Sequence, residues 1–298
     1  MFIELLLSIV VPLGLDLYLP VPVANPLTAE KVDLGHRLFN DPRLSIDGSL
    51  SCATCHRLER SFSSADPVAI GVFGRQGTRN APALVNLAYG RAFFRDGRET
   101  SLERQVLRPI EDPREMGFSA DDAAERVGLS REKLSQALAS YVRTILSGNS
   151  PYDRFVDGDR EALSAEARAG LALFRGKARC SQCHFGPTFS DETFHNTGVA
   201  MRDGVIADAG RFGVTGREPD RGAFRTPTLR EVARTAPYMH DGSLATLEDV
   251  IEFYDQGGRP NPALDPKIRP LGLAPDEKPA LVAFLLSLMG ELQEGWRP

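Results

Sequence analysis

Apolar residues recur at helical spacing in the stretch TLEDVIEFYDQGG, residues 246–258. Four of them lie at positions i, i+3, i+4 and i+7 and therefore share one face of a helix: Leu247, Val250, Ile251 and Tyr254. Thr246 can cap the N-terminus of this helix, and Gly257 can end it. If this face is buried, the phenol of Tyr254 needs a polar partner.

The same spacing predicts further helices, whereas strand patterns are few and short. One helix is expected over 101–107, capped by Thr100 and Glu103, and a second over 131–148, capped by Ser130 and ended by Gly148. A third is expected over 165–176, capped by Ser164, and a fourth over 279–292. The stretch GNSPYDRFVDGD, near residues 148–160, is rich in turn-forming residues and is expected to be a linker. The sequence therefore predicts a mainly α protein that divides near this linker.

The composition adds little to this picture but excludes one class of partner. The chain has 298 residues, of which 42% are hydrophobic and 25% charged, as in ordinary globular proteins. This length is enough for two domains with cores of their own. The net charge is −5 and no basic tract stands out, so no nucleic-acid partner is expected.

The N-terminus resembles an export signal in part. An apolar run from Leu5 to Val11 is broken by Pro12 and is too short to span a bilayer. Glu4 stands where a signal peptide carries Lys or Arg, and no A-x-A cleavage site is evident. We expect a periplasmic protein, with a degenerate signal or a true start further upstream. A buried N-terminal segment is the alternative.

The four cysteines form two C-x-x-C pairs, and a histidine directly follows each pair. The residues are Cys52, Cys55 and His56 in CATCH, and Cys180, Cys183 and His184 in CSQCH. This is the attachment pattern of c-type haem, in which the two thiols bind the haem covalently and the histidine binds the iron. A zinc site built from all four cysteines, or two redox C-x-x-C motifs, would leave both histidines without a role. The pattern therefore predicts two covalently bound c-type haems.

The segments around the two motifs repeat each other. GHRLF precedes the first motif and GLALF the second, while SFS follows the first and TFS the second. Such an internal repeat indicates two copies of one structural unit. We therefore expect an N-terminal extension or export signal, an N-terminal haem domain and a C-terminal haem domain, over residues 1–24, 25–155 and 156–298.

From about Asn25 onward, the chain resembles the bacterial di-haem cytochrome c peroxidases and their MauG-like relatives. The resemblance is carried by LGHRLFNDPRLS, SCATCH, GTRNAPAL, DGRETSLERQVLRPIEDPREMG, CSQCH, FHNTGV and FRTPTLREVARTAPYMHDGSLATLEDV. It implies two cytochrome c-like domains packed together. The first haem would be the peroxidatic one, and the second would receive electrons. A calcium ion would lie between them.

The resemblance implies a catalytic site at the first haem, whose iron His56 would bind. Many of these peroxidases carry a second histidine in the loop that is AIGVFGRQGTRN here, and this loop has none. An open iron that needs no prior reduction is therefore expected, as in MauG-like enzymes. Glu115 would shuttle the proton that cleavage of peroxide requires. Gln105, Pro109 and Phe94 would surround the same pocket. On composition alone, Glu115 would be a solvated loop acid and Gln105 an ordinary helix residue.

Between the haems, the chain departs from the family pattern. Arg95 stands where these enzymes typically have a tryptophan that can relay an electron, and the chain's single Trp is Trp296. The family's calcium ligands match Asn80 through its side chain, and Thr235 and Pro237 through their carbonyl oxygens. Oxygen-only ligation suits calcium. Without the resemblance, Asn80 would be taken to cap a turn.

At the second haem, the resemblance gives Tyr254 a partner. Family peroxidases place a methionine ligand fourteen residues after the histidine of the HDG motif, and MauG-like members place a tyrosine there. That histidine is His240 here, and Tyr254 follows at this distance. Tyr254 is therefore expected to bind the second iron opposite His184. A packed core residue is the alternative, and Met239 is the rival ligand. His36, His195 and His240 have no expected iron.

Three functions remain open. The protein could reduce hydrogen peroxide with electrons from a small cytochrome c or cupredoxin. It could instead use peroxide to oxidise side chains of a partner protein, as MauG does. A plain electron carrier is the third option, and the pocket around Glu115 and Gln105 disfavours it. The oligomeric state stays open.

Overall fold

The computed structural model describes residues 9–296, and helices dominate it. The longer helices are α1 (Ala29–Phe39), α5 (Ala120–Arg126), α6 (Arg131–Arg143), α7 (Pro151–Asp157), α8 (Ala165–Arg175), α10 (Leu247–Asp255) and α11 (Glu277–Leu286). Single-turn helices are α2 (Cys52–Cys55), α3 (Leu102–Gln105), α4 (Arg108–Glu111) and α9 (Phe212–Thr215). None of the described helices has the length and apolar character needed to cross a membrane.

The strands are short and form antiparallel pairs. They are β1 (Leu146–Gly148) with β6 (Glu291–Gln293), β2 (Phe194–His195) with β5 (Phe224–Arg225), and β3 (Met201–Arg202) with β4 (Val205–Ile206). The expectation of a mainly α protein with few short strands is therefore confirmed.

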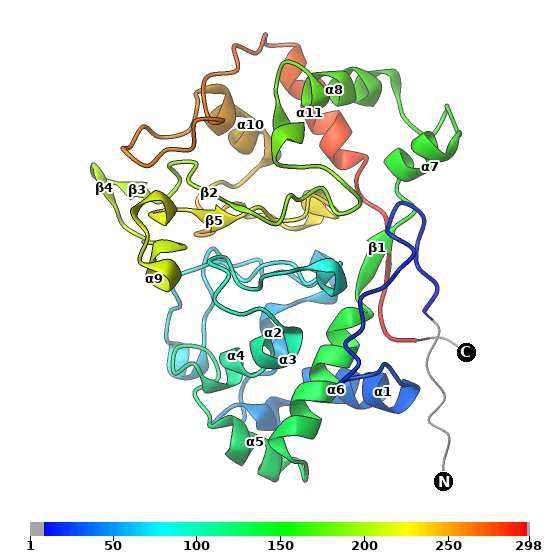
Figure 1. The fold of residues 1–298 in the computed structure, drawn as a ribbon, viewed down its shortest axis with the longest axis vertical. Helices are drawn as coiled ribbons and strands as arrows, with labels where there is room; N and C mark the ends of the chain where they lie inside the picture. Colours follow the sequence, from blue (N-terminus) through cyan, green and yellow to red (C-terminus); the bar gives the residue numbers. More distant parts are fainter. Residues whose placement is uncertain (1–8, 297–298) are drawn as a thin grey trace.

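Two helix pairs organise the molecule, and they repeat each other. Figure 1 shows α1 beside α6 in one half and α8 beside α11 in the other. A glycine lies at each crossing: a Cβ on Gly35 would overlap the carbonyl oxygen of Ala137, and a Cβ on Gly170 would overlap that of Ala280. Only glycine lets the helix backbones approach this closely. The glycines of GHRLF and GLALF are therefore explained by helix packing.

Each helix pair has its own hydrophobic core, but the chain termini cross between the halves. One core gathers buried residues between Leu27 and Ile145, and the other gathers residues between Leu163 and Leu288. Ile9 and Trp296, near the ends of the described chain, both pack on the first core. In Figure 1 the C-terminal segment accordingly runs from the upper half down to the lower one. The domain boundaries at 24 and 155 stay a prediction. Residues 1–8, which hold much of the signal-like run, lie outside the described residues.

Two of the predicted helices form but end earlier than expected, and the second, expected from 279, begins at Glu277. Ser130 caps α6 through the amide of Lys133, as predicted, but α6 ends at Arg143 rather than at Gly148. The next residues form β1, which pairs with β6, and the same pairing explains why α11 ends at Leu286. Pairing between distant segments here overrides the local helical pattern, which cannot reveal it.

The helix expected over 101–107 also differs from the structure. Ser101, not Thr100, caps α3, because its hydroxyl accepts a hydrogen bond from the amide of Arg104 at 3.3 Å. α3 ends at Gln105, and the chain begins a separate turn, α4, at Arg108. The expected capping box is therefore wrong by one residue.

The predicted linker contains a helix. α7 spans Pro151–Asp157, inside the stretch read as a linker. Ser150 and Asp153 form a capping box at its start, with Pro151 at the first helical position. Both features favour a helix start. The linker prediction rested on the turn-forming residues Gly, Asn and Asp, and it missed the capping box and the proline that start this helix.

A buried ion pair fastens α7 to the second half. Arg230 is 1% exposed, and its two terminal nitrogens lie 2.7 and 2.9 Å from the carboxylate of Asp153, itself 3% exposed. The same guanidinium donates to the carbonyl oxygens of Pro187 and Gly14, at 2.6 and 2.8 Å. Arg230 therefore joins the N-terminal segment, α7 and the loop after the second C-x-x-C-H motif.

Arg230→Met should lower the free energy of unfolding by about 3–5 kcal/mol, because it leaves the Asp153 carboxylate buried without a counter-charge. Chemical denaturation measures the effect. Arg221→Met is the matched control, since Arg221 forms an exposed pair with Glu218 on the surface. Equal stability of the two variants would show that the buried pair has no special weight.

Candidate haem sites

The first C-x-x-C-H motif forms a single helical turn with its histidine at the end. Cys52 and Cys55 lie in α2, and His56 follows as its C-terminal residue. The Nδ1 atom of His56 lies 2.9 Å from the carbonyl oxygen of Phe62, which fixes the ring and leaves Nε2 free of that contact. Burial lowers the pKa of His56, so the imidazole is neutral at neutral pH. A neutral, oriented imidazole is suited to bind a metal.

The second motif repeats this arrangement. The Nδ1 atom of His184 lies 2.8 Å from the carbonyl oxygen of Phe189, and burial lowers the pKa of His184. Phe62 and Phe189 both have a left-handed backbone, with φ of 58° and 53°. SFS and TFS are thus the turns that present a carbonyl oxygen to each histidine. Sequence reasoning noticed the repeat of these motifs but not this role.

The cysteines do not come together as one zinc site. Cys52 and Cys55 line a smaller cavity, and Cys180 and Cys183 line a larger one. Among the described residues, the one group with metal-ligand spacing contains a single cysteine, Cys183. A site built from all four cysteines is therefore contradicted. Burial raises the pKa of Cys52 and Cys180 to about 12, so both are neutral thiols at neutral pH.

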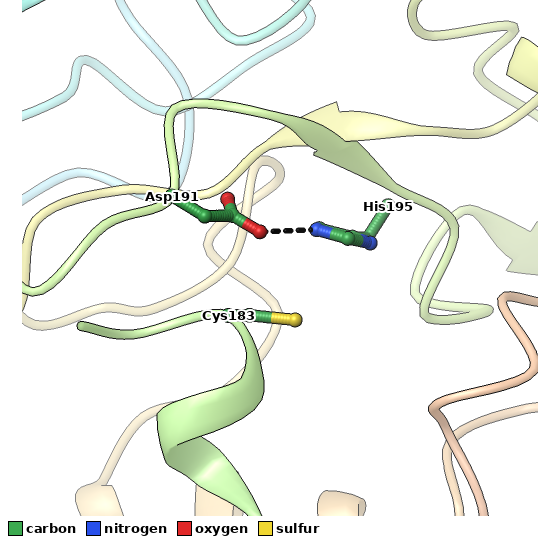
Figure 2. Close-up of side chains that lie close together, drawn as sticks. All are labelled: Cys183, Asp191 and His195. Carbon is green, nitrogen blue, oxygen red and sulfur yellow. Dashed lines mark hydrogen bonds and ion pairs between the residues drawn. The ribbon is translucent and has the colours of Figure 1, made fainter.

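Cys183 lies beside Asp191 and His195, as Figure 2 shows. His195 Nε2 lies 2.9 Å from Asp191, and Nδ1 lies 2.5 Å from Asp265. Hydrogen bonds to Cys183 first, and then to these two carboxylates, raise the pKa of His195 to about 10. A protonated histidine held by two carboxylates is no iron ligand. His195 instead ties the loop after the second motif to the 265 region.

The smaller cavity brings most of the expected catalytic residues together. Its volume is about 70 Å³, and the polar and motif residues that line it are Cys52, Cys55, His56, Gln105, Pro109 and Glu115. Its described lining contains no second histidine. The loop AIGVFGRQGTRN contacts the segment that carries Glu115, because the amide of Val72 donates to the Glu115 carbonyl oxygen at 2.7 Å.

Glu115 has a raised pKa. Burial, with a smaller contribution from Asp112, raises the pKa of Glu115 to about 7, although Arg98 acts in the opposite direction. A carboxyl group with this pKa can take up and release a proton near neutral pH. The structure thus places Glu115 inside the cavity rather than in solvent.

Phe94 lies elsewhere than expected. It lines the larger cavity and is missing from the described lining of the smaller one. The guanidinium of Arg98 stacks on its ring, with the central carbon 3.5 Å from the ring centroid. Phe94 also has a left-handed backbone, with φ of 66°. The Phe94 side chain therefore borders the larger cavity and not the smaller one.

The larger cavity, of about 270 Å³, contains His184 and Tyr254 in its lining. Helix α10 positions Tyr254, and its start is confirmed: Thr246 and Asp249 form a capping box. Burial raises the pKa of Tyr254 to about 12, and the nearby cysteines add a smaller increase in the same direction. Met239 lines the same cavity, so cavity lining alone does not separate the two rival ligands.

The lining of the larger cavity fits a haem. Four buried nitrogens there have no hydrogen-bond partner among the described residues: Arg95 Nε, Arg179 Nε, Arg225 Nε and His240 Nδ1. Buried donors need partners, and haem carries two carboxylates that supply them. Sequence reasoning missed this set, although Arg225 stands in the quoted motif FRTPT.

The expected calcium ligands lie on the same cavity. Asn80, Thr235 and Pro237 all line it. His240 is 5% exposed, and its ring stacks on Phe224 with 3.8 Å between centroids. His36, exposed on α1, lines neither cavity, and its ring lies 5.2 Å from that of Tyr141.

Comparisons with known proteins agree with this arrangement. Residues 29–161 match a family described as di-haem cytochrome c peroxidase. The chain is 41% identical over 290 residues to the methylamine utilization protein MauG of Methylorubrum extorquens, covering 91% of this chain and 82% of that protein. It is 38% identical to the cytochrome-c peroxidase IdrP1 of Denitromonas iodatirespirans, covering 93% and 86%.

A solved structure gives the same result in three dimensions. The crystal structure of a MauG-like protein associated with microbial copper homeostasis superposes with a TM-score of 0.83, at 38% identity. The match covers 93% of this chain and 94% of that one. The chain therefore belongs to the di-haem cytochrome c peroxidase family, which includes the MauG proteins and implies two c-type haems.

Proposed function

We propose that the protein is a periplasmic enzyme that reduces hydrogen peroxide at the first haem with electrons passed through the second. The observation that carries the proposal is that Glu115 and Gln105 line the same small cavity as Cys52, Cys55 and His56. The signal-like N-terminal run and covalent haem attachment support export. A small cytochrome c or cupredoxin is the proposed electron donor.

The residues of the first site have separate tasks. Cys52 and Cys55 would hold the haem, and His56 would bind its iron. When bound, the haems would pass on two electrons from the donor protein, which together with two protons convert hydrogen peroxide into two molecules of water. Glu115 accepts a proton from one peroxide oxygen and delivers it to the other, which leaves as water. Gln105 lines the same cavity and orients the peroxide by hydrogen bonding.

The second site differs in its ligands and therefore in its task. Cys180 and Cys183 would hold the haem there, and His184 and Tyr254 would bind its iron. A phenolate oxygen is anionic and favours oxidised iron. Arg95 has no oxidisable ring, so no charge passes through this side chain as it would through a tryptophan.

Oxidation of a partner protein is the second candidate function. Tyr254 and the missing second histidine favour it, as does the 41% identity to a MauG protein. Arg95 counts against the charge relay that such an enzyme uses. A plain electron carrier has no use for a proton shuttle, so the position of Glu115 disfavours it.

Steady-state turnover separates these functions. The protein is first shown to carry two haems that stay on the denatured chain through organic extraction. Peroxide should then oxidise reduced cytochrome c catalytically, without prior reduction of the enzyme, because the first site lacks a second histidine. His36→Ala, on the exposed face of α1, serves as the control variant. Peroxide-dependent modification of a protein, with no oxidation of cytochrome c or a cupredoxin, would favour the second function. Haem lost on extraction would contradict both.

A further inference from the structure

Arg95 is a cation without a carboxylate partner. Its Nη2 atom donates to Asn80 Oδ1 at 3.0 Å, and its Nε atom is buried with no partner among the described residues. An arginine guanidinium stays charged at neutral pH.

The carboxylates of this region are already paired with other arginines. Arg79 lies 2.6 Å from Asp96 and 2.8 Å from Asp208. Arg225 lies 2.7 Å from Glu192, and Arg202 pairs with Asp241. Because these carboxylates are already paired, no described carboxylate reaches Arg95, and its guanidinium contacts Asn80 instead.

Asn80 is fixed so that its side-chain oxygen faces Arg95. The Asn80 amide nitrogen Nδ2 donates to the carbonyl oxygen of Asp66 at 2.9 Å, and the backbone nitrogen donates to that of His240 at 2.7 Å. Thr235 and Pro237 line the same cavity, and no described residue donates a hydrogen bond to their carbonyl oxygens. The three oxygens expected to bind calcium therefore lie at a cavity where a cation is already present.

The guanidinium and a calcium ion do not fit together at these oxygens. The three expected ligands are neutral, and affinity for calcium rises with the number of charged ligands. A fixed positive charge within hydrogen-bonding distance of one ligand repels a divalent cation strongly where water is excluded. The neutral ligands do not offset this repulsion, so the guanidinium and the ion compete for Asn80.

We propose that the guanidinium of Arg95 takes the place of calcium at Asn80, Thr235 and Pro237, so that this protein works without the ion. The substitution at the family's tryptophan position then has two consequences: it removes the aromatic side chain and it places a cation on an expected calcium ligand. The proposal concerns the cation alone and holds whether peroxide or a partner protein is the substrate.

Metal analysis of the holoprotein tests the proposal. After equilibration with calcium and desalting, the wild-type protein should contain substoichiometric calcium. The chelator EGTA should change neither its thermal unfolding midpoint nor its haem absorption spectrum. Arg95→Trp removes the charge and restores the family's aromatic residue, so this variant should bind about one calcium ion per chain and become sensitive to EGTA.

Three further variants identify the site. Arg91→Gln, at an exposed arginine of the same loop, should stay free of calcium. Arg95→Lys keeps the charge and should also stay free of calcium, which guards against misfolding of the tryptophan variant. Asn80→Ala combined with Arg95→Trp should lose the calcium that Arg95→Trp gained. Stoichiometric calcium in the wild-type protein would overturn the proposal, and so would an Arg95→Trp variant that folds and binds none.

Discussion

Glu115→Gln should slow the reaction of the protein with hydrogen peroxide by about 10²- to 10⁴-fold, which is the usual loss when a positioned acid–base group is removed. Glutamine has nearly the same shape but cannot accept the peroxide proton. Both haem spectra should therefore stay as in the wild-type protein. Rapid mixing of the ferric protein with peroxide measures the rate directly.

The pH dependence of this rate gives a second and independent signature. Burial raises the pKa of Glu115 to about 7, so the carboxylate form prevails above that pH and the neutral acid below it. Because the carboxylate must accept the first proton, the wild-type rate should fall as the pH drops through about 7. The Glu115→Gln variant should have lost this dependence.

The control is an acid that lies outside the cavity. Glu125 is exposed on α5, and Glu125→Gln should react with peroxide like the wild-type protein. If Glu115→Gln reacts as fast as this control, another group moves the proton. The smaller cavity would then have to be reassigned among its remaining polar residues.

The sequence was most informative where the chemistry depends on side-chain identity. Each C-x-x-C-H motif names its thiols and its histidine directly, and the structure places both motifs on cavities. Glu115 was reached through a resemblance, because an acid in EDPREM has no local property that indicates burial. Its altered pKa arises mainly from burial in a cavity that residues distant in sequence, such as Cys55 and His56, also line.

What the sequence could not provide depends mostly on the backbone and on distant contacts. The carbonyl oxygens of Phe62 and Phe189 orient the two histidines, and a carbonyl group leaves no mark in a residue pattern. The strand pair β1–β6 joins segments that are far apart along the chain, so Leu146 was assigned to a helix. The cation–oxygen contact of Arg95 likewise needs the fold to bring Asn80 beside it.

The environment of Tyr254 makes its deprotonation dependent on a cation. Burial raises the pKa of Tyr254 to about 12, so at neutral pH the isolated side chain is a neutral phenol. Metal binding requires the deprotonated ligand and supplies the charge that stabilises it. The capping box of α10 holds the residue at a defined place in the cavity lining, where His184 also lies.

Tyr254→Phe should therefore remove one ligand without disturbing the other site. The ferric wild-type protein should give one high-spin and one low-spin haem signal in electron paramagnetic resonance. The low-spin signal should vanish in Tyr254→Phe, because the second iron is left open or bound to water. The first haem should keep its signal, since its ligand His56 lies in the smaller cavity.

Tyr254→Met tests the charge of the ligand rather than its presence. A neutral thioether stabilises ferrous iron better than phenolate does, so the potential of the second haem should rise by on the order of 100 mV, within the roughly 0.8 V that axial ligands span. A sulfur-to-iron absorption band should appear. Tyr18→Phe is the control, because Tyr18 is 74% exposed and lines neither cavity. If Tyr254→Phe keeps the low-spin signal, the phenol is core packing. Met239, which lines the same cavity, then becomes the ligand to test, and the MauG-like assignment loses its main support.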